Sequence, residues 1–275
     1  MTITAGIDVG STYTKAILLD DDSKIIARVL NRTGYKPGEI AEETYDAVLE
    51  MAGIGRDAVS YVVATGLGRF QAVFSQLGVT DLTSAAWGAN ALFPGTKTIL
   101  DVGGQSVKAL RCDEKSAVTS FRLNEKCAAG TGAFLEKTAR YMGFGTEDIG
   151  PLAVTSTLEI PISGVCTVFA EAEVINHLSQ GVAASDIMQG AIVSLVGKSV
   201  QLMKRVKMEP EVTLIGGIMR FPSMVTAVRE LLGIDVNVVE GDMVQYVSAL
   251  GAATLARYQL EKIRSDTDVG FVGVR

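Results

Sequence analysis

The sequence predicts an α/β chain built from two related halves. An internal repeat is the first observation: Asp8-Val9-Gly10 is followed by Lys15-Ala16, and Asp101-Val102-Gly103 is followed by Lys108-Ala109, at a constant offset of 93 residues. The second observation is that β-rich runs alternate with stretches of helical periodicity along most of the chain. We expect a first lobe over residues 1–93, a second lobe over 94–243, and a C-terminal helix over 244–275 that returns to the first lobe.

Each copy of the repeat has the pattern of a β-hairpin. Apolar runs over Ile3–Val9 and Thr98–Val102 lead into polar turns that contain glycine, and apolar residues resume over Tyr13–Leu19 and Val107–Arg111. A tight glycine turn between two such runs is typical of paired antiparallel strands.

Further elements follow each hairpin. The residue patterns predict strands over Tyr61–Thr65 and Val212–Ile215, and helices over Ile40–Met51, Gly132–Tyr141, Ser223–Leu232 and Tyr246–Ile263. The stretch Ala85–Gly95, which ends in Pro94-Gly95, is predicted to be the crossing between the lobes.

Composition restricts the class of function. The chain has 275 residues, 48% of them apolar, so it is a globular protein with room for two cores. Its net charge of −6 and the absence of a basic run argue against nucleic acid or an anionic membrane as partner. No stretch approaches the roughly 20 apolar residues of a membrane span, and the N-terminus lacks a signal-peptide pattern. We expect a soluble, cytoplasmic protein that acts on small molecules or proteins.

The first hairpin has the residues of a phosphate-binding turn. Gly10, Ser11 and Thr12 offer backbone N–H groups and two hydroxyls for phosphate oxygens. Lys15 is expected to return on the adjacent strand and to add a positive charge. An isolated turn of this kind can also be purely structural.

The second hairpin repeats this arrangement with Gly103 and Gly104. Asp8 and Asp101 are expected to face each other across a cleft, with Mg²⁺ and its waters between them and a triphosphate. Gln105 could orient the attacking water, while a turn-capping amide is the alternative interpretation.

Two glycine-containing segments follow. Gly216-Gly217 end a strand and would let the backbone approach an adenosine closely. The small residues of Ser248–Ala253 in the last helix are expected to permit close packing between the lobes.

In this order, the four motifs resemble those of the superfamily of actin, sugar kinases, acetate kinase and heat-shock chaperone ATPases. That resemblance implies ATP held between two ribonuclease-H-like lobes that open and close.

Two of the three cysteines have a setting suited to metal binding. Cys127 and Cys166 each lie at a polar, glycine-bearing turn directly before a helical run, where helix N–H groups stabilise a thiolate. Cys112 lies in an expected strand and His177 inside a helix, so neither is a candidate ligand. Two thiolates cannot complete a four-cysteine iron–sulfur site, and a second chain would have to supply the others. The alternative is that the cysteines are merely packed.

The segments Lys126-Cys127-Ala-Ala-Gly-Thr-Gly and Cys166-Thr-Val-Phe-Ala-Glu closely resemble the activators of 2-hydroxyacyl-CoA dehydratases and the ATP-binding subunits of benzoyl-CoA reductases. The resemblance implies a homodimer that shares one 4Fe–4S cluster through these two cysteines. It also implies ATP-driven delivery of a low-potential electron, from a ferredoxin or flavodoxin donor to a dehydratase, a benzoyl-CoA reductase or a double-cubane protein. Related activators also serve corrinoid proteins.

Two other functions stay open at this point. A small-molecule kinase of the same fold needs a group that accepts a substrate proton beside the γ-phosphate, and none is apparent in the sequence. The other is a nucleotide-binding subunit of a larger benzoyl-CoA reductase that is inactive alone.

Overall fold

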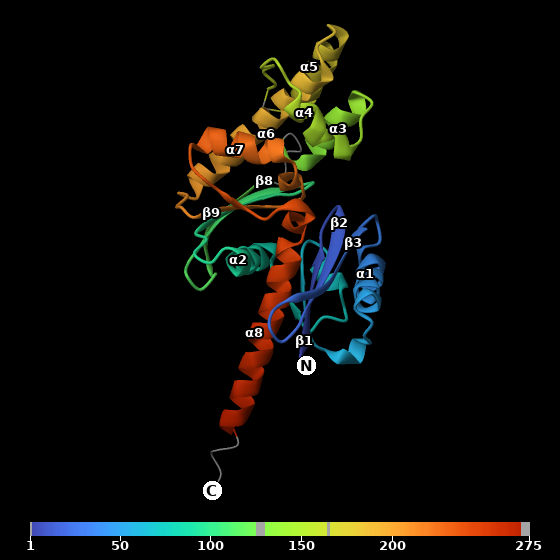
Figure 1. The fold of residues 1–275 in the computed structure, drawn as a ribbon, viewed down its shortest axis with the longest axis vertical. Coiled ribbons are helices and arrows are strands. Elements are labelled where there is room, and N and C mark those ends of the chain that lie inside the picture. Colours follow the sequence, from blue (N-terminus) through green and yellow to red (C-terminus); the bar gives the residue numbers. More distant parts are fainter. Residues whose placement is uncertain (1, 125–129, 164–165, 271–275) are drawn as a thin grey trace. The chain divides into compact units, whose positions relative to one another are not determined.

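The chain folds as two α/β units, each built around a five-stranded sheet. The structure is a computed structural model that describes residues 2–124, 130–163 and 166–270. The first unit combines residues 1–94 with 246–275, and the second spans residues 95–245 (Figure 1).

The sheet of the first unit has the strand order β3-β2-β1-β4-β5. The first three strands are antiparallel neighbours, whereas β4 and β5 run parallel to β1. The elements of this unit are β1 (Ile3–Val9), β2 (Tyr13–Leu19), β3 (Ile25–Arg32), α1 (Pro37–Ala52), η1 (Arg56–Ala58), β4 (Val59–Thr65), η2 (Arg69–Gln71), β5 (Leu77–Gly78), α2 (Asp81–Leu92) and α8 (Val247–Gly270).

The sheet of the second unit has the equivalent order, β10-β9-β6-β7-β8, with an antiparallel β6-β7-β8 meander followed by parallel β9 and β10. Its elements are β6 (Thr98–Val102), β7 (Val107–Cys112), β8 (Val118–Asn124), α3 (Gly132–Tyr141), η4 (Thr146–Asp148), α4 (Ile149–Val154), α5 (Thr167–Ser179), α6 (Ala184–Arg205), β9 (Val212–Ile215), η5 (Gly217–Arg220), α7 (Pro222–Leu232), β10 (Asn237–Val238) and η6 (Gly241–Gln245). Both hairpins and all the predicted strands and helices are therefore confirmed.

Strand β1 is buried on both faces. Ile7 and Val9, on one face, join the core cluster formed with the α1 residues Tyr45 and Val48. On the other face, the Thr4 hydroxyl donates to the backbone carbonyl of Ala253 in α8 at 3.3 Å. Because successive side chains of a strand point to opposite faces, one helix layer covers each side of this sheet.

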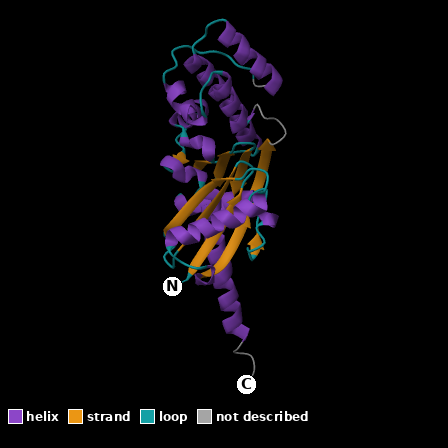
Figure 2. Cartoon of the chain, turned by 90° about the vertical axis from the view of Figure 1, so that its right-hand side faces the viewer, coloured by secondary structure: helices purple, strands orange, loops and turns teal. Residues whose placement is uncertain are grey.

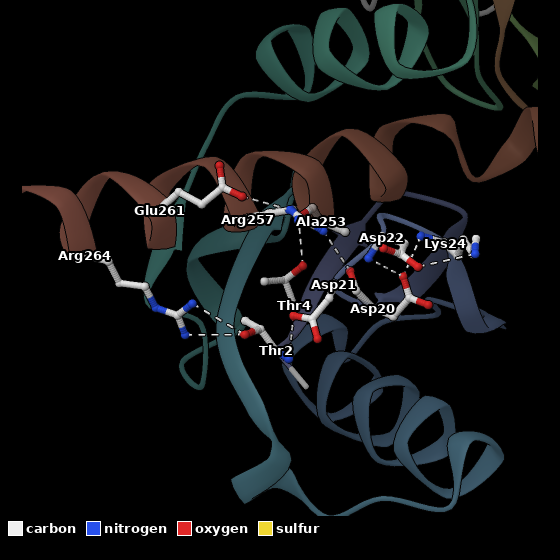
Figure 3. A network of polar contacts seen from close by, with 10 residues as sticks. All are labelled: Thr2, Thr4, Asp20, Asp21, Asp22, Lys24, Ala253, Arg257, Glu261 and Arg264. Carbon is white, nitrogen blue, oxygen red and sulfur yellow. Dashed lines mark hydrogen bonds and ion pairs between the residues drawn. The ribbon is translucent and has the colours of Figure 1, made fainter.

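Polar contacts also hold α8 to the first sheet. Arg257 donates to the carbonyl oxygen of Asp20 at 3.0 Å, and Arg264 donates to the Thr2 hydroxyl at 3.5 Å (Figure 3). The last turns of α8 extend past the sheet in both views (Figures 1 and 2).

The predicted crossing Ala85–Gly95 contains the division between the units, which falls after Pro94. Residues 85–92 are part of helix α2, so the crossing is confined to the last residues of the stretch. Helix α2 packs so closely on α8 that a Cβ on Gly88 would collide with the carbonyl oxygen of Val247. The small residues of Ser248–Ala253 therefore pack within the first unit, and their predicted packing between lobes is corrected.

The core of the second unit lies between its sheet and helices α6 and α7. Leu100 and Val102 of β6 join the same core cluster as Ile192 of α6 and Met224 of α7. The start of α6 is tied to the preceding segment by Asp186, whose carboxylate accepts hydrogen bonds from the backbone N–H groups of Thr157 and Leu158. These bonds hold the pKa of Asp186 below its usual value of 3.8.

No helix in the described ranges is both long and apolar enough to cross a membrane.

Candidate nucleotide and cluster site

The first hairpin places a carboxylate and an ammonium side by side. Asp8 and Lys15 are direct partners in the β1–β2 register, and Lys15 Nζ lies 3.0 Å from Asp8 Oδ2. Both side chains are largely buried, at 11% and 15% exposure. The pair therefore neutralises itself in the structure, and Lys15 is within reach of the turn that precedes it.

The turn of this hairpin is fixed by Thr33, the residue that directly follows β3. The Thr33 hydroxyl donates to the carbonyl oxygen of Gly10 at 2.8 Å, and the Thr33 backbone N–H donates to the carbonyl oxygen of Thr12 at 3.0 Å. The main chain around Gly10, Ser11 and Thr12 is thus held in one shape, with all three residues partly exposed. A turn that is already ordered loses little conformational entropy when it binds an anion.

The second hairpin repeats the pairing with the same geometry. Lys108 Nζ lies 3.0 Å from Asp101 Oδ2, and both side chains are again mostly buried. The loop between the strands is closed by a 2.9 Å hydrogen bond from the Gly103 N–H to the Ser106 carbonyl oxygen. Gln105 lies at the exposed tip of this loop.

Each carboxylate is also packed against a glycine from the parallel strand beside it. Gly66 follows β4 with φ +88°, and a Cβ there would lie 2.5 Å from Asp8 Oδ1. Gly216 follows β9 with φ +100°, and a Cβ there would lie 2.5 Å from Asp101 Oδ1. Only glycine suits both the positive φ and the close approach, so the two units share one carboxylate–glycine arrangement.

The second loop is bonded directly to the start of helix α3. The Gly132 N–H donates to the Gly103 carbonyl oxygen at 3.0 Å, and the Ala133 N–H donates to the Gly104 carbonyl oxygen at 2.7 Å. These N–H groups belong to the first turn of the helix, which has no acceptor within the helix itself. The loop and the start of α3 are therefore joined directly by hydrogen bonds.

Cys166 is the N-cap residue of α5 and is partly exposed. The first turn of α5 has no acidic residue, so the partial positive charge of the helix N-terminus faces the thiol unopposed within its own helix. Cys127 lies outside the described residues. Within the ranges that are described, no three His, Cys, Asp or Glu side chains gather as a metal site. Cys166 carries a sulfur atom of the kind that iron–sulfur clusters use as a ligand.

Comparison with known proteins agrees with this geometry. Residues 5–256 match the BadF/BadG/BcrA/BcrD ATPase family. The chain belongs to this family. It is 38% identical over 259 residues to the activator of lactoyl-CoA dehydratase from Anaerotignum propionicum, in a match that covers 94% of this chain and 99% of the relative. It is 33% identical over 271 residues to one of the subunits of the benzoyl-CoA reductase from Thauera aromatica, over 96% of each chain.

Two solved structures extend the likeness to three dimensions. Component A of the Acidaminococcus fermentans (R)-2-hydroxyglutaryl-CoA dehydratase superposes with a TM-score of 0.90 at 34% identity, over 95% of this chain and 100% of that one. The activator of the 2-hydroxyisocaproyl-CoA dehydratase from Clostridium difficile, solved with bound ADPNP, gives 0.89 at 32% identity, over 96% and 97%. The chain is thus an ATPase-family member with the two-lobe α/β actin-like fold.

For this BadF/BadG/BcrA/BcrD-family chain, the structure groups the predicted site residues by unit. The end of β1 brings together Asp8, Lys15 and the turn over 10–12, whereas the end of β6 brings together Asp101, the loop over 103–105 and Gly216-Gly217. Cys112 is confirmed as a strand residue: it is buried in β7, and its thiol donates to the Thr96 carbonyl oxygen at 3.3 Å. His177 lies in α5, as expected.

Two features of this site were not predicted from the sequence. Gly66 is the counterpart of Gly216, and its signal was a glycine directly after the predicted strand Tyr61–Thr65. The second is a contact between helices, in which Glu171 of α5 bonds to Lys137 and Tyr141 of α3. A contact of this kind depends on tertiary packing and leaves no periodic pattern.

Proposed function

We propose that this chain is an ATP-hydrolysing electron-transfer activator that delivers low-potential electrons to a 2-hydroxyacyl-CoA dehydratase, a benzoyl-CoA reductase or a related double-cubane enzyme. The observation that carries the proposal is the direct bonding of the loop at Gly103 and Gly104 to the first turn of α3. The candidate phosphate loop and a helix that follows a candidate cluster cysteine are thereby bonded to each other.

ATP and Mg²⁺ fit the two hairpins. The ordered turn at Gly10, Ser11 and Thr12, together with Lys15, would hold phosphate oxygens, and Gly103 and Gly104 would do the same from the second unit. Asp8 and Asp101 are hard oxygen donors suited to Mg²⁺ through its waters. The relative that was solved with ADPNP supports this assignment.

Hydrolysis needs a group that orients water rather than a base for a substrate hydroxyl. Gln105 is exposed at the tip of the second loop and carries a neutral amide that can both donate and accept. Gly216-Gly217 would let the backbone lie close to the adenosine. ADP is then the product, and no phosphorylated metabolite is formed.

A shared 4Fe–4S cluster fits the thiol at the start of α5. Cys166 and Cys127 would each supply a thiolate, and a second copy of the chain would supply the other two. When bound, the cluster would hold the single electron that is transferred. Exposed apolar side chains on α5, Val168 at 69% and Phe169 at 63%, lie beside Cys166 and favour burial of this helix end against another chain.

The coupling we propose is mechanical. Nucleotide exchange shifts the loop at Gly103 and Gly104, α3 follows through its two hydrogen bonds, and the surroundings of the cysteines change. A ferredoxin or flavodoxin supplies the electron, and hydrolysis makes its onward transfer directional.

One alternative has specific support. The 33% identity to a benzoyl-CoA reductase component is compatible with a nucleotide-binding subunit that is inactive without sister chains. A homodimer that hydrolyses ATP on its own would exclude it.

Iron and sulfide analysis of anoxically purified protein tests the proposal. We expect about one 4Fe–4S cluster for every two chains, because only two of the three cysteines have ligand-like settings. Cys112→Ser is the matched control and should leave this ratio unchanged, since Cys112 is buried in β7. Cys166→Ser should remove the cluster. One complete cluster on each monomer, or a cluster that survives Cys166→Ser, would contradict the shared site.

A further inference from the structure

Helices α3 and α5 are joined by a polar contact that the nucleotide loops do not touch. Lys137 Nζ lies 2.8 Å from Glu171 Oε2, and the Tyr141 hydroxyl donates to the same oxygen at 3.1 Å. Lys137 and Tyr141 lie one turn apart on α3, so both reach a single carboxylate of α5. These three residues are called the Glu171 bridge.

The Glu171 bridge differs from an ordinary surface ion pair. Exposed pairs contribute little because water screens them. Here the Lys137 side chain is 51% exposed, but the Glu171 side chain, which accepts from both donors, is only 16% exposed. Two donors from α3 converge on it, and the hydrogen bond to Glu171 raises the pKa of Lys137, with a smaller contribution from Tyr141. The contact is therefore charge-assisted and fixed in direction.

Helix α5 has a small buried face. Its buried residues are Ala170 and Val174, with Leu178 packed partly against the core. Glu173 adds a polar contact by accepting a hydrogen bond from the Ser163 backbone N–H at 2.6 Å. Helix α3, in contrast, buries Phe134 and Leu135 in the core of the second unit. An amphipathic helix takes its orientation from its buried face, so a helix with so small a buried face depends on polar contacts such as the Glu171 bridge.

The bridge completes a continuous path through the second unit. The carbonyl groups of Gly103 and Gly104 hold the first turn of α3, α3 holds Glu171, and Glu171 lies on the helix that begins after Cys166. Every step is a hydrogen bond or a rigid helix.

We propose that Glu171 is a positioning residue that transmits movement of the nucleotide loop from α3 to α5 and so sets the orientation of Cys166. This inference rests on the proposed function, because it specifies which contact carries the coupling. If the proposal is right, loss of the bridge makes the reactivity of the Cys166 thiol independent of which nucleotide is bound.

The test measures alkylation of the Cys166 thiol in the full-length, cluster-free chain, resolved by peptide mass spectrometry. Rates are taken with saturating ADP and with a saturating non-hydrolysable ATP analogue. We expect the two rates to differ by about fivefold or more in the parent chain, the lower end of typical allosteric coupling. In Glu171→Gln and Lys137→Gln the ratio should fall to less than about twofold.

Three further variants separate positioning from general damage. Lys137→Arg keeps the charge and should retain most of the ratio, and Tyr141→Phe removes one of two donors and should give an intermediate value. Arg140→Gln is the matched control: it removes the pair with Glu136 inside α3, at 3.6 Å, and should leave the ratio unchanged. The reduction potential of each cluster-loaded variant, measured with both nucleotides, provides a second readout. We expect the nucleotide-dependent shift in potential to rank the variants in the same order as the alkylation ratio.

The outcomes distinguish the two proposals. If the ratio of the two alkylation rates is the same in the parent chain, Glu171→Gln and Lys137→Gln, the bridge has no positioning role and the proposed function stands. If Cys166 of the parent chain does not respond to nucleotide at all, the coupling fails and the role of the bridge fails with it.

Discussion

At the residue scale, each unit carries one carboxylate in an equivalent setting. Asp8 and Asp101 each bond to a lysine on the next strand at 3.0 Å, and each packs against a glycine with positive φ. The sequence repeat predicts the aspartate and lysine positions, because a hairpin register is local. It does not predict Gly66, because the packing of a parallel strand beside Asp8 is not local.

Gln105→Ala tests the role of the second loop in hydrolysis. We expect ATP turnover to fall by about 10²-fold, the lower range for groups that manage a proton or water, while nucleotide affinity changes little. Asp8→Ala and Asp101→Ala should abolish Mg²⁺-dependent hydrolysis altogether. Steady-state turnover and equilibrium nucleotide binding are the measurements. If Gln105→Ala hydrolyses ATP at the parent rate, the Gln105 amide does not orient water and instead caps the turn.

At the element scale, the strands and helices next to the motifs are predicted well, since their apolar runs are continuous. The third strands of both sheets, β3 and β8, lie outside the sequence prediction. Both are mostly exposed or half-buried, and they become strands because they pair with β2 and β7. The predicted crossing Ala85–Gly95 overlaps helix α2, whose Gly88 packs closely against α8.

Gly88→Val tests that close packing. The new side chain would collide with the backbone of α8 at Val247, and backbone cannot move aside as a side chain can. We expect destabilisation of about 1–3 kcal/mol or more, measured by denaturant unfolding. Gly197→Ala is the matched control, because a Cβ at this helical glycine meets open space and should stabilise by about 0.5–1 kcal/mol. Equal free energies of unfolding for Gly88→Val and the parent chain would contradict the close α2–α8 contact.

At the scale of the whole molecule, the two sheets share one strand order, and each carries a candidate phosphate hairpin. The second unit adds helices α3 to α5 between β8 and the last strands of its sheet, and Cys166 starts one of these helices. The sequence motifs predict both hairpins and the position of Cys166 at a helix start. They could not reveal the hydrogen bonds that join the second loop to α3, because these link backbone groups irrespective of side chain.

The central claim is that nucleotide and cluster influence each other, and linkage requires any such influence to be reciprocal. The most direct measurement takes the anoxic, cluster-loaded protein with ADP and with a non-hydrolysable ATP analogue. In each state it records the rate at which an iron chelator removes the cluster and the reduction potential. The account predicts faster removal and a shifted potential with the ATP analogue, with about 59 mV for each tenfold change in the one-electron equilibrium. Identical rates and potentials with both nucleotides would contradict it.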